Sequence, residues 1–346
     1  MNAAIDAVIR AWLVVAAWLR LHRKPALHRL ARIRRPMGFV RAALVPAGRM
    51  VALAIALLPR KHRREAAITY VACKALAAFD DADAAVATGR ITAAIHYLTG
   101  ESADAPRAGS GQTTQVHGLQ VLLAARLPLL RAAIKGLPGD AARRCSAIIE
   151  RIGDGMIRAR ADRRCAVDHV FGEAVFAAAR LTVPSLHPPG FACTAAGRAL
   201  QLADAVRRAA SADARDGLLY QALQALPTVP RLLRWLPATV EAGTRAAAAL
   251  IAATTYRFYL RELAAAVPRR LRHPLRAAIA AALSRRAYLA VVEAIEDGVH
   301  DALELLAARV ADRTQAALPV PAVSTSAPLA TWTRYSITPM QQPLEQ

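Results

Sequence analysis

The stretch Phe79-Asp80-Asp81-Ala82-Asp83 ends a run, residues 66–78, that is almost wholly apolar or small. If the helix predicted by this run continues through the acids, Asp80 and Asp83 share a face, and Asp81 lies about 100° round from Asp80. Such carboxylates suit Mg²⁺, which is usually held by one or two carboxylates, several waters and substrate phosphate oxygens. An acidic helix end or a solvated turn would account for the same residues.

The composition around this stretch favours an all-α fold. The chain has 346 residues, enough for one large domain or two modest ones, and ample apolar material for a core. Alanine and leucine dominate, while Gly, Pro and β-branched residues are too sparse for a strand-rich protein. We therefore expect a helical bundle.

The charge of the chain narrows the class of partner. Its 46 Lys and Arg against 25 Asp and Glu give a formal charge of +21, which suits nucleic acid, an anionic membrane or a phosphorylated substrate. A nucleic-acid-binding protein should show a recognisable reading module, and the sequence has only a basic arm, so we expect no nucleic acid. Four widely spaced cysteines indicate reduced thiols and a cytoplasmic protein.

The first 64 residues hold a large part of this charge, with fourteen Lys or Arg and one acid, Asp6. The apolar stretch 11–19 is too short to span a bilayer, and its basic cluster follows it, unlike that of a signal peptide. A cationic amphipathic helix with Trp12 and Trp18 could lie peripherally on the inner face of a membrane. Alternatively, the helix packs on the body and leaves its basic face in water.

Three parts follow from these patterns along the chain. Residues 1–49 form a basic amphipathic arm, residues 50–317 a single helical domain, and residues 318–346 a disordered tail rich in Pro, Ser, Thr and Gln. Inside the domain we expect one long helix from Glu65 through the acids and a loop over 213–219.

A second stretch suggests a family. Residues 197–208 read GRALQLADAVRR, and residues 213–220 read DARDGLLY. They resemble the squalene and phytoene synthase family, whose helix reads roughly Gly-x-Ala-x-Gln-Leu-Thr-Asn-Ile-Leu-Arg-Asp before a Gly-Arg-x-Tyr turn. Weaker matches occur in the same order over residues 50–290. They are Leu57–Arg60 with Arg63 and Arg64, Asp80 with Asp81, residues 152–156, residues 170–172, and residues 255–260 with Arg269 and Arg270.

The resemblance implies an all-α isoprenoid synthase fold around a central apolar cavity. In this family two acidic motifs on facing helices hold Mg²⁺ and a prenyl diphosphate. Carried over to this chain, the catalytic acids are Asp80, Asp81 and Asp83, and the metal ligands are these three with Asp204. The diphosphate-binding residues implied in the same way are Arg63, Asp204, Arg207, Arg208 and Tyr220.

The sequence departs from the family at both motifs. Ala84 replaces the last acid of the first motif, and the second motif has Arg208 at its first Asp and Ser211 and Ala212 at its last acids. Arg207 and Arg208 could bind a diphosphate directly as cations, or form a solvated basic helix face. Asp204 could bind metal or pair with Arg208, four residues on.

One good acidic cluster suits the activation of a single diphosphate. We therefore expect Mg²⁺-dependent transfer of one prenyl group from an allylic prenyl diphosphate to an acceptor lacking diphosphate, such as an aromatic, carbazole-like ring. Head-to-head synthesis of the phytoene or squalene type is the first alternative. A non-catalytic helical partner protein is the second.

Overall fold

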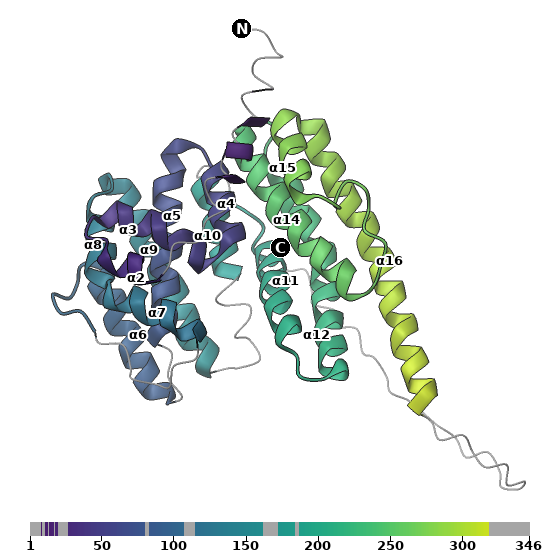
Figure 1. Cartoon of the computed structure of the whole chain (residues 1–346), viewed down its shortest axis with the longest axis horizontal. Helices are drawn as coiled ribbons and strands as arrows, with labels where there is room; N and C mark the ends of the chain where they lie inside the picture. The colour runs from purple at the N-terminus through teal and green to yellow at the C-terminus, as the bar shows by residue number, and fades with distance from the viewer. Residues whose placement is uncertain are drawn as a thin grey trace, which may run out of the picture.

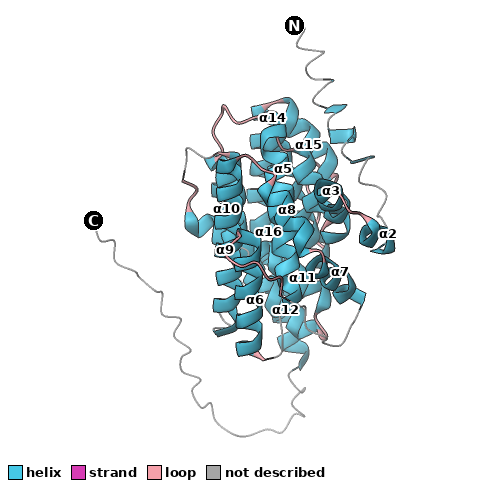
Figure 2. Cartoon of the chain, turned by 90° about the vertical axis from the view of Figure 1, so that its left-hand side faces the viewer, coloured by secondary structure: helices cyan, strands magenta, loops and turns pink. Residues whose placement is uncertain are grey.

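The structure is a computed structural model. It describes residues 27–79, 83–106, 115–161, 172–183 and 187–317, together with Val8, Ala11, Trp12, residues 14–16, Trp18 and Leu19. Every regular element in these residues is a helix, so the all-α prediction is confirmed (Figure 1, Figure 2). None of the described helices is both long enough and apolar enough to cross a bilayer.

An N-terminal lobe gathers most of the helices that precede residue 162. Its helices are α2 (Leu27–Arg32), α3 (Pro36–Ala47), α5 (Arg60–Leu76), α6 (Ala84–Thr99), α7 (Gln115–Ala125), α8 (Leu127–Lys135) and α9 (Gly139–Ala161). They enclose one apolar core in which Phe39, Ile68 and Ile91 are fully buried. Phe39 comes from α3, so packing continues across the predicted boundary between the arm and the domain.

An ion pair between a buried carboxylate and a half-exposed arginine joins two helices of this lobe. Glu65 on α5 is 1% exposed, and its two carboxylate oxygens accept hydrogen bonds from Nε and Nη2 of Arg144 on α9, at 3.0 and 2.9 Å. Next to it, the Thr69 hydroxyl lies 3.1 Å from the Sγ atom of Cys145. The pair fixes α5 against α9, and α5 leads directly into the acidic stretch.

A C-terminal lobe follows from residue 190. Its helices are α11 (Gly190–Arg208), α12 (Ala212–Ala225), α13 (Val229–Trp235), α14 (Ala242–Glu262), α15 (Pro274–Leu283) and α16 (Arg285–Ala317). Its core contains three fully buried tyrosines, Tyr256, Tyr259 and Tyr288. Each hydroxyl donates a hydrogen bond to a main-chain carbonyl oxygen. Tyr256 donates to Leu226 at 3.5 Å, Tyr259 to Ala199, and Tyr288 to Leu233 at 2.7 Å.

Two short helices connect the lobes, as Figure 1 shows. Helix α4 (Arg49–Leu57) packs against α14 as well as α3 and α5, and α10 (Glu173–Thr182) lies between α9 and α11. The start of α14 approaches the end of α4 so closely that a Cβ atom on Gly243 would lie 2.1 Å from the Leu57 carbonyl oxygen. Only glycine fits this joint without movement of the backbone.

Residues 213–219 are helical, so the loop predicted there is wrong. Ser211 is the N-cap of α12, and its hydroxyl accepts a hydrogen bond from the Ala214 N–H at 3.1 Å. Asp213 in the first turn also favours a helix start through the helix dipole. Leu219 and Leu223, four residues apart, then bury one face of α12 in the core of the C-terminal lobe.

Candidate functional site

The acidic stretch lies at a corner between two helices. Helix α5 ends at Leu76, the 3₁₀ turn η1 (Ala77–Phe79) follows with Phe79 buried, and α6 begins at Ala84. The long helix predicted through the acids is therefore wrong, and Asp80 and Asp83 cannot be placed on one face by helical spacing. Asp80 and Asp81 lie outside the described residues.

Asp83 is the N-cap of α6. Its exposed carboxylate accepts hydrogen bonds through Oδ1 from the N–H groups of Ala85 and Val86, at 2.8 and 3.1 Å. A capping carboxylate satisfies backbone donors that have no partner inside the helix, and it also benefits from the helix dipole. Asp83 thus has a structural function that the sequence interpretation did not include.

Arg63 lies far from this corner. It is in the first turn of α5, where its Nε and Nη2 donate to the Leu58 carbonyl oxygen at 3.2 and 2.9 Å. The thirteen residues from Arg63 to the end of α5 rise by about 20 Å. The structure therefore does not bring Arg63 together with Asp83, and the guanidinium closes the turn at Pro59 instead.

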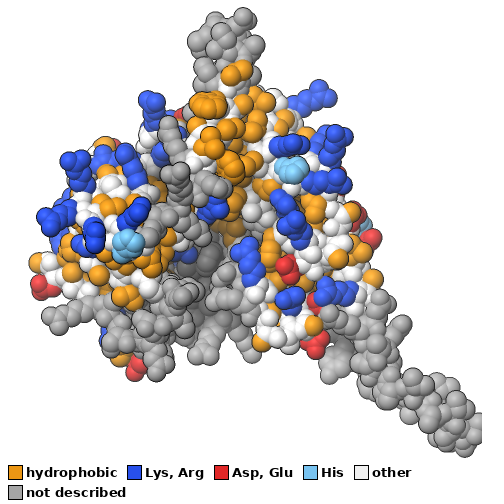
Figure 3. All heavy atoms as spheres, in the orientation of Figure 1, with side chains coloured by type: hydrophobic (Ala, Val, Ile, Leu, Met, Phe, Trp, Pro, Cys, Tyr) orange, Lys and Arg blue, Asp and Glu red, His pale blue; other side chains and the backbone are white. Residues whose placement is uncertain are grey.

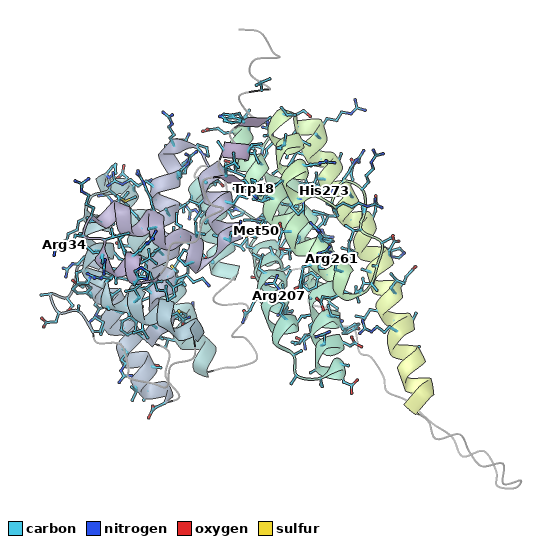
Figure 4. All side chains as sticks on the ribbon, in the orientation of Figure 1. Trp18, Arg34, Met50, Arg207, Arg261 and His273 are labelled. Carbon is cyan, nitrogen blue, oxygen red and sulfur yellow. The ribbon has the colours of Figure 1, made fainter. Side chains whose placement is uncertain are left out.

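The second predicted motif occupies the end of α11 and the start of α12. Asp204 and Arg208 are in the last turns of α11, and their side chains are not described. Arg207, labelled in Figure 4, is exposed. Its guanidinium lies over the ring of Phe258 on α14, 4.6 Å from the ring centroid. Tyr220 is 54% exposed on α12. Helix α11 ends at Arg208, so Asp213 belongs to a different helix from Asp204.

The sequence interpretation missed a buried acid in α12. Asp216 is 6% exposed, and its Oδ1 lies 3.4 Å from Nη2 of Arg309 on α16, an ion pair slightly longer than a good hydrogen bond. Nη1 of Arg309 donates to the Glu262 carbonyl oxygen, and the Glu262 carboxylate is 3.9 Å from Arg215. Together these groups link α12, α14 and α16. The spacing of Asp216 three residues before the buried Leu219 was the available signal.

Within the described ranges, no three His, Cys, Asp or Glu side chains form a group that could hold a metal ion. Of the four predicted Mg²⁺ ligands, only Asp83 has a described side chain, and its Oδ1 is engaged in capping. The described side chains alone therefore do not make a magnesium site, which would have to be completed by Asp80 and Asp81.

Comparison with solved structures finds the squalene synthase TcSQS. Its complex with the ligand E5700 matches with a TM-score of 0.54 and 16% identity, over 79% of this chain and 98% of that chain. Its complex with BPH1237 matches with a TM-score of 0.58 and 16% identity, over 79% and 99% of the two chains. No protein-family model and no curated protein matches the sequence. The chain thus has the all-α fold of squalene synthase over almost the whole length of that protein.

Proposed function

We propose that the chain is a prenyltransferase of the isoprenoid-synthase type. It binds one allylic prenyl diphosphate and transfers the prenyl group to an acceptor lacking diphosphate, with an aromatic ring as the acceptor class. The observation that carries this proposal is the squalene synthase fold, combined with the acidic stretch at the corner between η1 and α6.

The chemistry needs stabilisation of a departing diphosphate and protection of a carbocation from water. Candidate cations on the chain are Arg207 and Arg208 at the end of α11. Mg²⁺ held by Asp80, Asp81, Asp83 and Asp204 would add positive charge at the diphosphate. Apolar side chains of the helices would have to exclude water from the carbocation.

A single diphosphate is favoured by the composition of α11. Where the family's second motif has its first Asp, α11 ends with Arg208, and the next acid, Asp213, begins another helix. Head-to-head synthesis would require two diphosphates to be held and ionised. The match to squalene synthase supports that reaction as the second candidate, and the loss of motif acids supports a non-catalytic partner as the third.

The test is release of pyrophosphate. Full-length protein is incubated with Mg²⁺ and dimethylallyl, geranyl, farnesyl or geranylgeranyl diphosphate, with and without an extract that supplies acceptors. Acceptor-dependent release supports the proposal. Release without acceptor, with a symmetrical hydrocarbon as product, supports head-to-head synthesis. No release with any donor from folded protein would exclude both enzymes.

A double variant tests the acidic stretch. Asp80→Ala with Asp81→Ala should abolish pyrophosphate release. Asp297→Ala with Asp301→Ala removes the same charge from exposed positions on α16 and should leave release unchanged. If the first variant keeps full activity, the diphosphate is activated elsewhere in the protein.

A further inference from the structure

The described part of the N-terminal segment has an exposed apolar face. Its backbone is helical, and Val14 is buried in a cluster with Leu53, Leu250, Ala278 and other residues of α4, α14 and α15. Val8, Trp12 and Leu19 are 68%, 62% and 53% exposed. Their spacing of four and seven places them on one side of a helix. We call these three residues the tryptophan stripe.

The two tryptophans of this segment, Trp12 and Trp18, are both exposed to solvent. Trp18 is 36% exposed and is labelled, as is Met50 of α4, in Figure 4. Tryptophan favours the boundary between a bilayer and water, because its ring is apolar and its N–H is polar. Because Val14 already anchors the segment, the exposed stripe is not needed for packing within the chain.

A pocket of about 400 Å³ opens on the neighbouring hairpin of α15 and α16. Four exposed arginines line it, Arg269, Arg270, Arg276 and Arg286, and no acid is among its lining residues. Arg270 is held in place because its Nη1 donates to the Ala290 carbonyl oxygen at 3.3 Å. We call these four residues the arginine pocket. Its size and charge suit a phosphate group.

Helix α15 connects the stripe and the pocket. Ala278 and Ala282 pack in the cluster that contains Val14, while Arg276 and Ala280 line the arginine pocket. With ten residues, α15 is about 15 Å long, so both features border the same short helix. Figure 3 shows an apolar band beside a cluster of Lys and Arg on the same face, and Figure 4 places His273 next to that band.

We propose that the tryptophan stripe and the arginine pocket together dock the protein onto an anionic phospholipid bilayer. Trp12 and Leu19 enter the boundary between headgroups and acyl chains, and the arginines bind lipid phosphates. The formal charge of +21 complements such a surface. A second copy of the chain is a poor occupant, because it would bring another four-arginine pocket towards this one. The proposal does not depend on the proposed enzymatic activity.

The test is flotation of the full-length protein with vesicles. Binding is measured to pure phosphatidylcholine and to phosphatidylcholine mixed with phosphatidylglycerol, at low and high salt. We expect binding only to the anionic vesicles and weaker binding at high salt. Arg276→Ser with Arg286→Ser should weaken it about 25-fold, roughly fivefold per arginine. Trp12→Ser with Leu19→Ser should weaken it about tenfold or more.

The matched control is Arg158→Ser with Arg231→Ser, which removes the same charge from exposed positions on α9 and α13. Equal losses in the control and the pocket variant would overturn the proposal, because binding would then depend only on net charge. Equal binding to neutral and anionic vesicles would also overturn it. Light scattering provides the last check by measuring the oligomeric state. If the protein is a dimer, and Trp12→Ser with Leu19→Ser dissociates it without any loss of vesicle binding, the tryptophan stripe binds a second copy of the chain and the proposal is overturned.

Discussion

The two lobes keep polar groups in their cores in different ways. The N-terminal lobe buries one carboxylate, Glu65, against a bidentate arginine partner. The C-terminal lobe buries three neutral tyrosines, each bonded to a main-chain carbonyl. It also buries Asp216, 3.4 Å from Arg309, and Arg245, which donates to the carbonyl oxygens of Val240 and Ala281.

This difference predicts which perturbation destabilises each lobe. A buried charge is costly without its partner, so the N-terminal lobe depends on one side chain. A neutral hydrogen bond contributes only about 1 kcal/mol, so the C-terminal lobe spreads its dependence over several groups. Tyrosines, however, ionise at high pH. The N-terminal lobe should therefore be the more sensitive to a single substitution. Both lobes should be sensitive to alkali, because burial also raises the pKa of Tyr70, Cys73 and Cys145 in the N-terminal lobe.

The largest effect is expected for Arg144→Ala. Hydrogen bonding to Glu65 raises the pKa of Arg144. Without Arg144 the buried carboxylate of Glu65 loses both hydrogen bonds from the guanidinium, and the free energy of unfolding should fall by about 3 kcal/mol, the lower end for a broken buried pair because Arg144 itself is half-exposed. Urea unfolding measures this loss. Arg143→Ala is the control, because Arg143 pairs with Asp140 on the surface and should cost less than about 1 kcal/mol. Equal losses of unfolding free energy would mean that the Glu65–Arg144 pair contributes no more to stability than a surface ion pair.

Gly243→Ala should break the joint between the lobes. The new Cβ would lie 2.1 Å from the Leu57 carbonyl oxygen, a backbone atom that can move only together with α4. We expect a loss of about 2 kcal/mol in unfolding free energy. Gly217→Ala has open space around its Cβ within α12 and should instead stabilise the protein by about 0.5 kcal/mol. If both variants behave alike, the close approach of α4 and α14 is not rigid.

Alkaline pH should destabilise the C-terminal lobe through its buried tyrosines. Burial raises the pKa of Tyr256, Tyr259 and Tyr288, whereas these phenols ionise near pH 10 in the unfolded chain. The unfolded state therefore loses protons first, so the stabilisation is complete below about pH 10 and is lost as the pH rises further. Each tyrosine contributes about 1.4 kcal/mol per pH unit above that point.

Tyr288→Phe tests this slope. The variant should lose about 1 kcal/mol at neutral pH through the missing hydrogen bond to the Leu233 carbonyl, but its stability should fall less steeply above about pH 10. Tyr220→Phe, at an exposed position, is the control and should keep the original slope. Urea unfolding at a series of alkaline pH values measures both, and an unchanged slope for Tyr288→Phe would contradict the assignment.

Local patterns in the sequence predicted the fold class but not the breaks between helices. Composition and spacing correctly gave an all-α protein. Residues 66–78 and 84–98 both have helical patterns, so the short interruption at the acids was read as continuous helix. At α12, Asp213 and Gly217 suggested a loop, although Ser211 was a good N-cap signal. Helix ends depend on single caps and on tertiary packing, which periodicity does not record.

Contacts between residues that are far apart in the sequence could not be predicted either. Glu65 and Arg144 are 79 residues apart in the sequence, and no sequence motif predicts that they pair. The family resemblance gave the order of candidate residues along the chain, but order is not distance. Arg63 lies in the first turn of α5, whereas Asp83 lies beyond the other end of α5, at the start of α6. Asp83 itself was recognised as a candidate, yet its capping bonds appear only once α6 is seen to start at Ala84.

The smallest effect is expected at Asp83, which caps α6 and is also a candidate metal ligand. Asp83→Ala removes the cap of α6 and should lower the free energy of unfolding by about 1 kcal/mol, whereas Asp83→Asn keeps an oxygen for the Ala85 and Val86 N–H groups and should cost little. Urea unfolding measures the cap, and pyrophosphate release measures the site. If the charge of Asp83 serves the diphosphate chemistry, the stable Asn variant loses activity as fully as the Ala variant. If the Asn variant keeps its activity, Asp83 acts only as a cap, and the acidic stretch must work through Asp80 and Asp81.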